Sequence, residues 1–376
     1  MKIRIITTII VLSLLSVMLT YGQTTVIRRQ NTIAKPNTSN QGKQNAQGTQ
    51  TKTAKLSIYG SFHEGLARVL SNALRYGFID LRGNNVIPCK WKYCGEFTEG
   101  LAWVADDNYK YGFIDKTGKS VSSCKWESAH AFSEGLALVR DDNHKYGFID
   151  KTGALVIPCK WKNAKDFSEG LAAVQGEEGD WGYIDKSGKI VIPMEIWEAQ
   201  SFSEGLAYVY VGLEKTGYID KSGTLIIKKN WKSSWGLKFS EGLSCGRGYY
   251  VGDRYYYIDR TGKIIIDEKY ASVRDFSEGL AVVVDDKGKY GYIDKTGKEI
   301  IPCKWKYASS FSEGLALVQD DNNKYGFIDK TGTLVIPCKY RIAYDFSDGL
   351  TVVKDNGTIH IINTKGELVK TLNNIR

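Results

Sequence analysis

Short apolar runs alternate with clusters of turn residues along the whole of residues 56–376. In one regular unit the apolar runs begin at Leu136, Tyr146 and Leu155, and Asp, Asn, Thr and Gly fill the segments between them. No run has the length or the roughly 3.6-residue period of a helix, whereas runs of about four to eight residues bounded by turn residues are typical of β-strands. The pattern therefore predicts a β-meander of three strands in each unit.

The strands and turns of this unit also indicate how it is packed. Leu136 and Leu138 share one face of the first strand, and the opposite face is apolar too, so both faces should be covered. Pro158 should end or bulge the third strand, or place it at a sheet edge, because proline removes a backbone donor. Asp150 begins a short hairpin loop in which it accepts hydrogen bonds from the turn and Gly153 takes the left-handed conformation.

The unit recurs nine times, and two markers keep their phase. Glu-Gly-Leu, or Asp-Gly-Leu in the last copy, recurs at intervals of 35 residues with two of 37. An Ile-Asp pair followed by a glycine lies at a fixed distance after most of these tripeptides. Such periodicity identifies a tandem repeat, so residues 56–376 are predicted to form one all-β domain of nine units of about 35 residues. The structural markers in two regular units are Glu99, Gly100, Asp115, Gly118, Glu134, Gly135, Asp150 and Gly153.

Two architectures would bury the faces that a single unit leaves exposed: an open superhelix and a closed, propeller-like ring. The chain enters and leaves the repeat near the same point, which would allow the N-terminal segment to complete the last blade of a ring. Propellers, however, usually have about four to eight blades of four strands, built from somewhat longer repeats. The open superhelix, or solenoid, is therefore the favoured expectation, and the closed ring is the alternative.

The first 55 residues differ from the repeats. Residues 1–22 have the three parts of a secretory signal peptide: a basic start, an apolar run from Ile5 to Leu19, and small residues before an expected cut after Gly22. A membrane anchor is the alternative, but the run is shorter than the roughly 20 residues that a span needs. No Cys directly follows the apolar run, so a lipid-anchored lipoprotein is not expected. Residues 23–55 lack acidic groups and are predicted to be a disordered tether. We expect a secreted, periplasmic or cell-surface protein.

The positive net charge comes from this leading part. Of the net charge of +9, residues 1–55 supply +8, so the repeats carry 9 − 8 = +1. Nucleic-acid binding is therefore not predicted, because the repeats have no excess of basic groups. The eight basic residues are Lys2, Arg4, Arg28, Arg29, Lys35, Lys43, Lys52 and Lys55.

The recurring motif F-S-E-G-L-A-x-V … Y/W-G-F/Y-I-D-K-T/S-G-x-x-V-I-P resembles the WG-repeat (KWG) family of mainly bacterial secreted or envelope proteins. The resemblance covers residues 56–376, although only Trp181-Gly182 carries the namesake pair. Unit five has Thr216 before its glycine, and Tyr256 and His360 replace the glycine in units six and nine. The family implies an interaction role and no activity common to its members.

Cysteine chemistry is not predicted. Five of the seven cysteines occupy one repeat position, 35 or more residues apart, which is unlike the short ligand spacing of metal sites. They are expected to be small buried side chains beside Trp, with no obligatory disulfide framework and no metal. These five are Cys89, Cys124, Cys159, Cys303 and Cys338.

Catalysis has no support in the repeat pattern. A glutamate repeated in equivalent copies suits a structural bond, because an active site combines residues with different roles. The four histidines fall in different phases of the repeat: His63, His130, His144 and His360. The acid pairs lack the spacing of Ca²⁺ loops and are expected at solvated hairpin tips. The pairs are Asp106-Asp107, Asp141-Asp142, Asp285-Asp286 and Asp320-Asp321. No enzyme activity or cofactor is expected, and a propeller hydrolase, which would need a unique acidic cluster, is a third alternative.

Aromatic residues leave two roles open. Those on the apolar face of the third strand suit core packing better than sugar stacking: Trp91, Trp126, Trp161 and Trp305. Units five and six break the pattern and are predicted to hold any specialised surface, at Trp231, Trp235, Tyr249, Tyr250 and Tyr255. The favoured function is a non-enzymatic scaffold for an unknown protein partner at the cell envelope. The alternative is carbohydrate or cell-wall binding through exposed aromatic residues.

Overall fold

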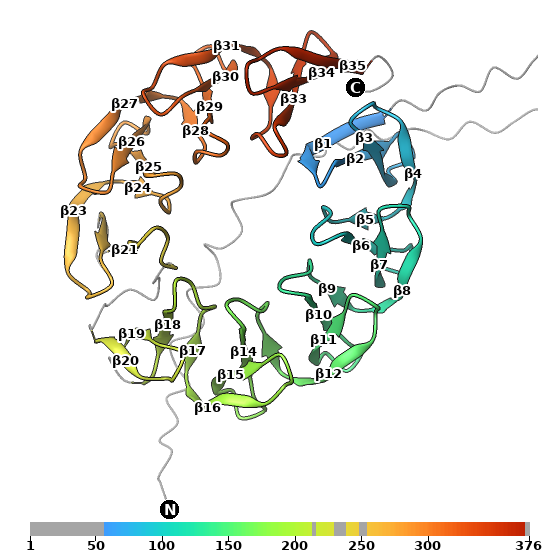
Figure 1. Cartoon of the computed structure of the whole chain (residues 1–376), viewed down its shortest axis with the longest axis vertical. Coiled ribbons are helices and arrows are strands. Elements are labelled where there is room, and N and C mark those ends of the chain that lie inside the picture. The colour runs from blue at the N-terminus through green and yellow to red at the C-terminus, as the bar shows by residue number, and fades with distance from the viewer. Residues whose placement is uncertain (1–55, 213–215, 229–237, 248–253, 373–376) are drawn as a thin grey trace, which may run out of the picture. The chain divides into compact units, whose positions relative to one another are not determined.

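The computed structural model describes residues 56–212, 216–228, 238–247 and 254–372, so the predicted signal peptide and tether lie outside the described residues. Within these ranges the chain forms nine antiparallel sheets, each built from consecutive strands. Eight sheets have four strands, and the sixth has three within the described ranges. Figure 1 shows the sheets arranged around a ring as the blades of a β-propeller.

The strands follow one another in the same order in every blade. Blades 1 to 3 contain β1 (Leu56–His63), β2 (Leu66–Ser71), β3 (Tyr76–Asp80), β4 (Asn85–Trp91); β5 (Tyr93–Cys94), β6 (Leu101–Ala105), β7 (Tyr111–Asp115), β8 (Ser120–Trp126); β9 (Ser128–Ala129), β10 (Leu136–Arg140), β11 (Tyr146–Asp150) and β12 (Leu155–Trp161). Blades 4 to 6 contain β13 (Asn163–Ala164), β14 (Leu171–Gln175), β15 (Trp181–Asp185), β16 (Ile190–Ile196); β17 (Glu198–Ala199), β18 (Ala207–Tyr210), β19 (Thr216–Ile219), β20 (Leu225–Lys228); β21 (Ser244–Arg247), β22 (Tyr255–Ile258) and β23 (Ile264–Tyr270). Blades 7 to 9 contain β24 (Ser272–Val273), β25 (Leu280–Val284), β26 (Tyr290–Asp294), β27 (Glu299–Trp305); β28 (Tyr307–Ala308), β29 (Ala316–Gln319), β30 (Tyr325–Ile328), β31 (Leu334–Tyr340); β32 (Ile342–Ala343), β33 (Leu350–Asp355), β34 (Thr358–Asn363) and β35 (Leu368–Leu372).

A short strand that the hydrophobic pattern did not predict begins most blades. In blade 2 it is β5, whose Tyr93 and Cys94 pair with Ala105 and Val104. Two residues are too few to show a period, so the sequence predicted three strands where the structure has four. These first strands lie on the inner side of the ring and the fourth strands on its outer side (Figure 1).

Antiparallel pairing sorts the turns onto two edges of each blade. The Glu-Gly turn joins strands one and two, and the Asp-Lys-Thr-Gly turn joins strands three and four, so both lie at one edge, which we call the glutamate face. The turn with the paired acids joins strands two and three and lies at the opposite edge, which we call the acid-pair face. Equivalent turns of neighbouring blades are therefore brought side by side.

The expectation of an open superhelix was wrong, because blade 9 packs against blade 1. Ile58 and Phe62 share one buried apolar cluster with Val352, Ile359 and Leu372, which lie about three hundred residues away in sequence. The ring buries apolar faces that an open array would leave exposed at its two ends, and this favours closure. The ring has nine blades, which exceeds the roughly four to eight that propellers usually have.

The N-terminal strand also differs from its expected place. β1 pairs with β2 within blade 1, and blade 9 is complete with β32 to β35, so no blade combines strands from the two ends of the chain. Closure of the ring therefore depends on contacts between blades 9 and 1 and not on a shared sheet.

Aromatic rings repeat along the core between blades. Phe148 on β11 contacts Phe167 of the next blade, with ring centroids 4.8 Å apart in an edge-to-face arrangement, the geometry that aromatic pairs prefer. Eight ring contacts of this kind, five edge-to-face and three tilted, have centroid distances between 4.7 and 5.0 Å. At the ninth interface Ile361 takes the place of the first ring and shares its cluster with Phe62. The interface that closes the ring thus lacks the aromatic pair.

Glycine precedes this aromatic residue for a steric reason. A Cβ atom on Gly147 would lie 2.5 Å from the carbonyl oxygen of Ile157, because strands three and four approach closely at a register shift. Blade 6 has Tyr256 at the equivalent position, and the residue paired with it is Gly246, whose own Cβ would meet the Tyr256 ring at 2.5 Å. The regular blades pair Val with Gly here, so blade 6 exchanges the small and the large residue across the strand pair.

Candidate interaction surface

A continuous series of hydrogen bonds links the Glu-Gly turns on the glutamate face. The Glu134 carboxylate accepts a hydrogen bond of 2.9 Å from the backbone N–H of Gly170 in the next blade. All nine blades repeat this contact at 2.9 to 3.0 Å, and Asp348 closes the series by accepting from Gly65. The repeated acid therefore has a structural role between blades.

The turn geometry explains why this glutamate is unusual. Glu134 and Gly135 both have positive φ, 54° and 86°, as a two-residue type I′ hairpin requires. Asn would suit the first of these positions better, because a positive φ is costly for most side chains. The longer glutamate is explained by its reach to the next blade and not by the preference of the turn itself.

A lysine from the next blade supports most of these carboxylates. Lys116, in the turn between β7 and β8, lies 3.0 Å from the Glu64 carboxylate. Burial alone would raise the pKa of Glu64, but the hydrogen bonds from Lys116 and Gly100 lower it overall. Two carboxylates lack a basic residue at this position, which holds Thr364 for Glu313 and Leu81 for Asp348. The same pair recurs for Lys151, Lys186, Lys221, Lys295 and Lys330, at 3.0 to 3.2 Å.

The paired acids of the opposite face have two different structural partners. Asp106 accepts hydrogen bonds from the backbone of its own turn, at Asn108 and Lys110. The second acid of the pair, Asp107, forms a 2.6 Å ion pair with Arg75 of the preceding blade. No group of three or more metal-ligating side chains occurs within the described residues. The pairs between blades are Arg75–Asp107, Lys110–Asp142, Lys145–Glu177, Arg254–Asp286 and Lys289–Asp321.

The cysteines and tryptophans at repeat positions lie within the blades. The Cys159 thiol is half-buried beside Gly147, and burial raises its pKa to about 11, which keeps it protonated at neutral pH. Trp161 is 6% exposed, and the Lys160 ammonium lies 4.8 Å from its ring centroid. Trp126 and Trp305 are equally buried and Trp91 is partly buried, so these rings do not form a sugar platform.

The histidines make separate contacts. His130 lies 3.1 Å from Asp166 of the next blade, and this hydrogen bond raises its pKa. His144 contacts Glu127, and His360 contacts Thr371.

A polar cluster that does not repeat joins blades 1 and 2. The Glu96 carboxylate lies 2.8 Å from the Arg68 guanidinium and 3.1 Å from His63. The cluster holds a single carboxylate between two basic groups, whereas glycoside hydrolysis commonly needs two carboxylates. Its geometry is that of an ion-pair network.

The predicted surface of units five and six is only partly described. Trp231, Trp235, Tyr249 and Tyr250 lie outside the described residues. Tyr255 is partly buried and packs against the core between blades 6 and 7, so it is not part of an exposed platform.

Exposed tyrosines gather instead on blades 1 and 2, where the repeat pattern did not predict a surface. Tyr59, Tyr93 and Tyr109 are 44%, 41% and 55% exposed, and Leu74 in the neighbouring turn is 67% exposed. Tyr76 lies between Tyr59 and Tyr93, and the successive ring centroids from Tyr59 through Tyr76 and Tyr93 to Tyr109 are 6.1 to 6.4 Å apart. We call Tyr59, Leu74, Tyr76, Tyr93 and Tyr109 the tyrosine patch.

One signal in the sequence could have located this patch. Leu74 and Tyr109 occupy a turn position at which the regular unit 3 has His144 and unit 8 has Asn323, all with φ between 56° and 60°. A large apolar or aromatic residue at a hairpin tip has no core to fill. This departure from the repeat marks blades 1 and 2 as different.

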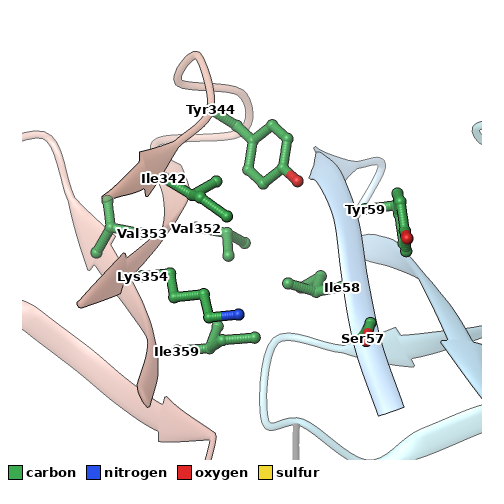
Figure 2. Close-up of a pocket in the computed structure, with 9 residues that line it drawn as sticks. All are labelled: Ser57, Ile58, Tyr59, Ile342, Tyr344, Val352, Val353, Lys354 and Ile359. Atoms are coloured by element: carbon green, nitrogen blue, oxygen red, sulfur yellow. The ribbon is translucent and has the colours of Figure 1, made fainter. Parts of the chain in front are cut away.

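A pocket lies beside the patch, at the seam where blade 9 meets β1. Its volume is about 190 Å³, and Figure 2 shows Ile58 and Val352 pointing toward each other across it. Smaller side chains account for the space, because Ile359 and Ser57 take the places that Tyr76 and Tyr93 occupy at the next interface. The residues that line it are Ser57, Ile58, Tyr59, Ile342, Tyr344, Val352, Val353, Lys354 and Ile359.

In the described part of the chain, the structure contains no helix with the length and hydrophobicity needed to cross a bilayer.

Comparison with known proteins supports the repeat and the fold. A family model described as "WG containing repeat" matches residues 76–109, 111–143, 146–178, 181–212, 257–289, 290–325 and 325–358. No protein of curated function matches the sequence. Among solved structures, a eukaryotic initiation factor has a TM-score of 0.55 at 12% identity, covering 85% of this chain and 96% of that chain. The designed Ika8 protein and BamB from Moraxella catarrhalis have TM-scores of 0.40 and 0.35 at 11% identity, covering 84% and 83% of this chain and 98% of theirs. The likeness to the initiation factor concerns the fold alone.

Proposed function

Because the chain belongs to the family of WG-containing repeat proteins, we propose that it is a non-enzymatic scaffold whose tyrosine patch binds a protein partner. The repeated acids, lysines and aromatic rings make contacts between blades, so they account for the ring itself. The patch is different, because Tyr59, Tyr93 and Tyr109 are exposed and the turn position of Tyr109 is polar in units 3 and 8. This exposure is the observation that carries the proposal.

The composition of the patch suits a protein interface. Tyrosine gives a large contact area with few rotatable bonds and is enriched among the residues that dominate binding energy. The Lys92 ammonium lies 5.6 Å from the Tyr109 ring and adds a basic group at the border. The acid-pair face elsewhere carries ion pairs that satisfy one another, such as Lys145 with Glu177.

A glycan is the second candidate ligand, and the exposed rings of Tyr93 and Tyr109 are the observation that favours it. The planes of these two rings are tilted by 43°, so they do not form one flat platform for a sugar chain. For this reason the protein partner ranks first.

We propose a secreted, periplasmic or cell-surface location as well. The features of residues 1–22 support it, namely the basic start, the apolar run and the small residues before the expected cut. The partner would then be a protein of the cell envelope. Expression of the whole chain followed by N-terminal sequencing of the mature product tests this part, and an uncleaved cytoplasmic product contradicts it.

The binding proposal is tested with a double variant, Tyr93→Ser with Tyr109→Ser. Wild-type and variant chains are immobilised and exposed to envelope proteins of the source cells, and the bound proteins are identified by mass spectrometry. We expect at least one envelope protein to bind the wild type and to be lost from the variant. The same two chains applied to a glycan array separate the two candidates.

A control removes a tyrosine pair away from the patch, Tyr290→Ser with Tyr307→Ser, which occupy the repeat positions of Tyr76 and Tyr93. This control should keep the partner. Equal loss in both variants, or retention in both, contradicts the assignment to the patch, and glycan binding that depends on Tyr93 and Tyr109 replaces the protein with a sugar.

A further inference from the structure

The seam pocket has the dimensions of a small ligand site. Apolar cavities of about 150 Å³ bind a benzene-sized molecule, so the volume of about 190 Å³ has room for one ring and a short polar group. Ile58, Val352 and Ile359 are buried and form its apolar wall. The pocket lies between blades and not within one sheet, and ligand sites are often found at such junctions.

One cationic group enters this apolar surface. Figure 2 shows the Lys354 amino group directed between Ile58 and Ile359, and the Tyr344 hydroxyl at the other end of the pocket. None of the nine lining residues is acidic. No ion pair involves Lys354 within the described residues.

Blade 3 shows the kind of counter-ion that Lys354 lacks. Arg140 occupies the equivalent position in blade 3, where Glu127 lies 3.3 Å from its guanidinium and compensates the charge. The residue at the position of Glu127 in blade 9 is Arg341, which adds a positive charge in place of a negative one. A partly buried ammonium without a counter-ion favours an anionic ligand, because charges removed from water need a partner.

From these observations we propose that the seam pocket binds a small carboxylate with an aromatic or branched apolar body. The carboxylate contacts Lys354, and the apolar body packs between Ile58, Val352 and Ile359. The site is separate from the protein-binding role of the tyrosine patch, although Tyr59 borders both.

Ligand-observed NMR with the whole chain tests the proposal. Phenylacetate is the probe, and phenylacetamide is its neutral analogue of the same shape. We expect phenylacetate to bind the wild type about tenfold more tightly than phenylacetamide, since a hydrogen bond to a charged group is the stronger kind. Lys354→Met should remove this preference and leave weak binding of both compounds.

Two further variants separate the pocket from a nonspecific charge effect. Ser57→Tyr places in β1 the side chain that Tyr93 has in β5, and it should abolish binding of both probes while the ring stays folded. Lys370→Met removes an exposed lysine of β35 that does not line the pocket, and it should bind as the wild type does. Absence of phenylacetate binding by the wild type, or a preference that survives Lys354→Met or disappears in Lys370→Met, overturns the proposal. If Lys354→Met does not fold, Lys354→Gln gives the same comparison.

Discussion

The Asp348 carboxylate accepts a 3.0 Å hydrogen bond from the backbone N–H of Gly65, although 283 residues separate the two in sequence. This bond closes the series that joins the glutamate face of all nine blades. The closing interface has fewer of the repeated contacts than the others, because Leu81 replaces the supporting lysine and Ile361 replaces the aromatic ring. We therefore expect the seam to open before any other interface.

Replacing Asp348 with Ala should loosen the seam selectively. The Gly65 N–H is near solvent, so the free energy of unfolding should fall by only about 0.5–1 kcal/mol. Hydrogen exchange of the β1 amides should become faster, as measured by mass spectrometry. Glu134→Ala is the control, because it removes the same contact between blades 3 and 4; exchange in β1 that responds equally to both variants would contradict a local role.

Gly147 should be intolerant of any side chain. Its Cβ would lie 2.5 Å from the Ile157 carbonyl oxygen, which belongs to backbone, so Gly147→Ala should lower the free energy of unfolding by about 2–4 kcal/mol. Gly135→Ala is the matched control, since nothing lies within 4 Å of its Cβ and only its φ of 86° is unfavourable. It should cost about 1 kcal/mol. Denaturant unfolding measures both, and equal losses would refute the steric explanation.

The exchange of sizes in blade 6 predicts coupling between two substitutions. Gly246→Val should clash with the Tyr256 ring, and the further change Tyr256→Gly should restore the Val–Gly pair of the regular blades, such as Val104 with Gly112. A double-mutant cycle should give a coupling of about 1–3 kcal/mol in favour of the pair. Additive effects of the two substitutions would show that the residues do not compensate each other.

Acid should weaken the contacts between blades. Burial would raise the pKa of Glu134, but the Gly170 N–H and Lys186 lower it below its usual 4.5 overall. A carboxylate with a lowered pKa in the folded state stabilises fully above its unfolded pKa, and this contribution is lost as the pH falls through the folded pKa. The urea midpoint should therefore decrease from neutral pH to about pH 3.

The control for this pH dependence is Glu134→Gln. It should lower the midpoint at neutral pH and have a smaller effect at low pH, where the wild-type carboxylate is protonated too. A constant difference between the two chains at every pH would mean that Glu134 does not contribute through its charge.

Local features of the fold could be derived from the sequence, and long-range ones could not. The Asp150 turn follows from its residue types, and its carboxylate accepts from the Thr152 hydroxyl and backbone. Repetition showed that the Glu134 role is structural, but its partner lies 36 residues away in the next blade. Closure depends on the angle between successive blades added over nine units, and no single contact in a unit reveals that angle.

The candidate sites were missed for a related reason. Leu74 and Tyr109 can be recognised in the sequence as departures from the repeat. The exposure of their side chains, however, depends on how the turns are arranged in the folded ring. The seam pocket arises from Ser57 and Ile359, which are distant in sequence and small only in comparison with Tyr93 and Tyr76. Periodicity identifies the contacts that every interface between blades shares. These two sites are formed by residues that differ from the repeat, so periodicity does not reveal them.

Each sheet is assembled from consecutive strands, and this has a consequence for how such proteins grow. Duplication or loss of one unit of the gene would change the circumference of the ring without separating any pair of hydrogen-bonded strands. Only the packing angle between neighbours would have to adjust, so blade number can change during evolution while every blade keeps its internal pairing.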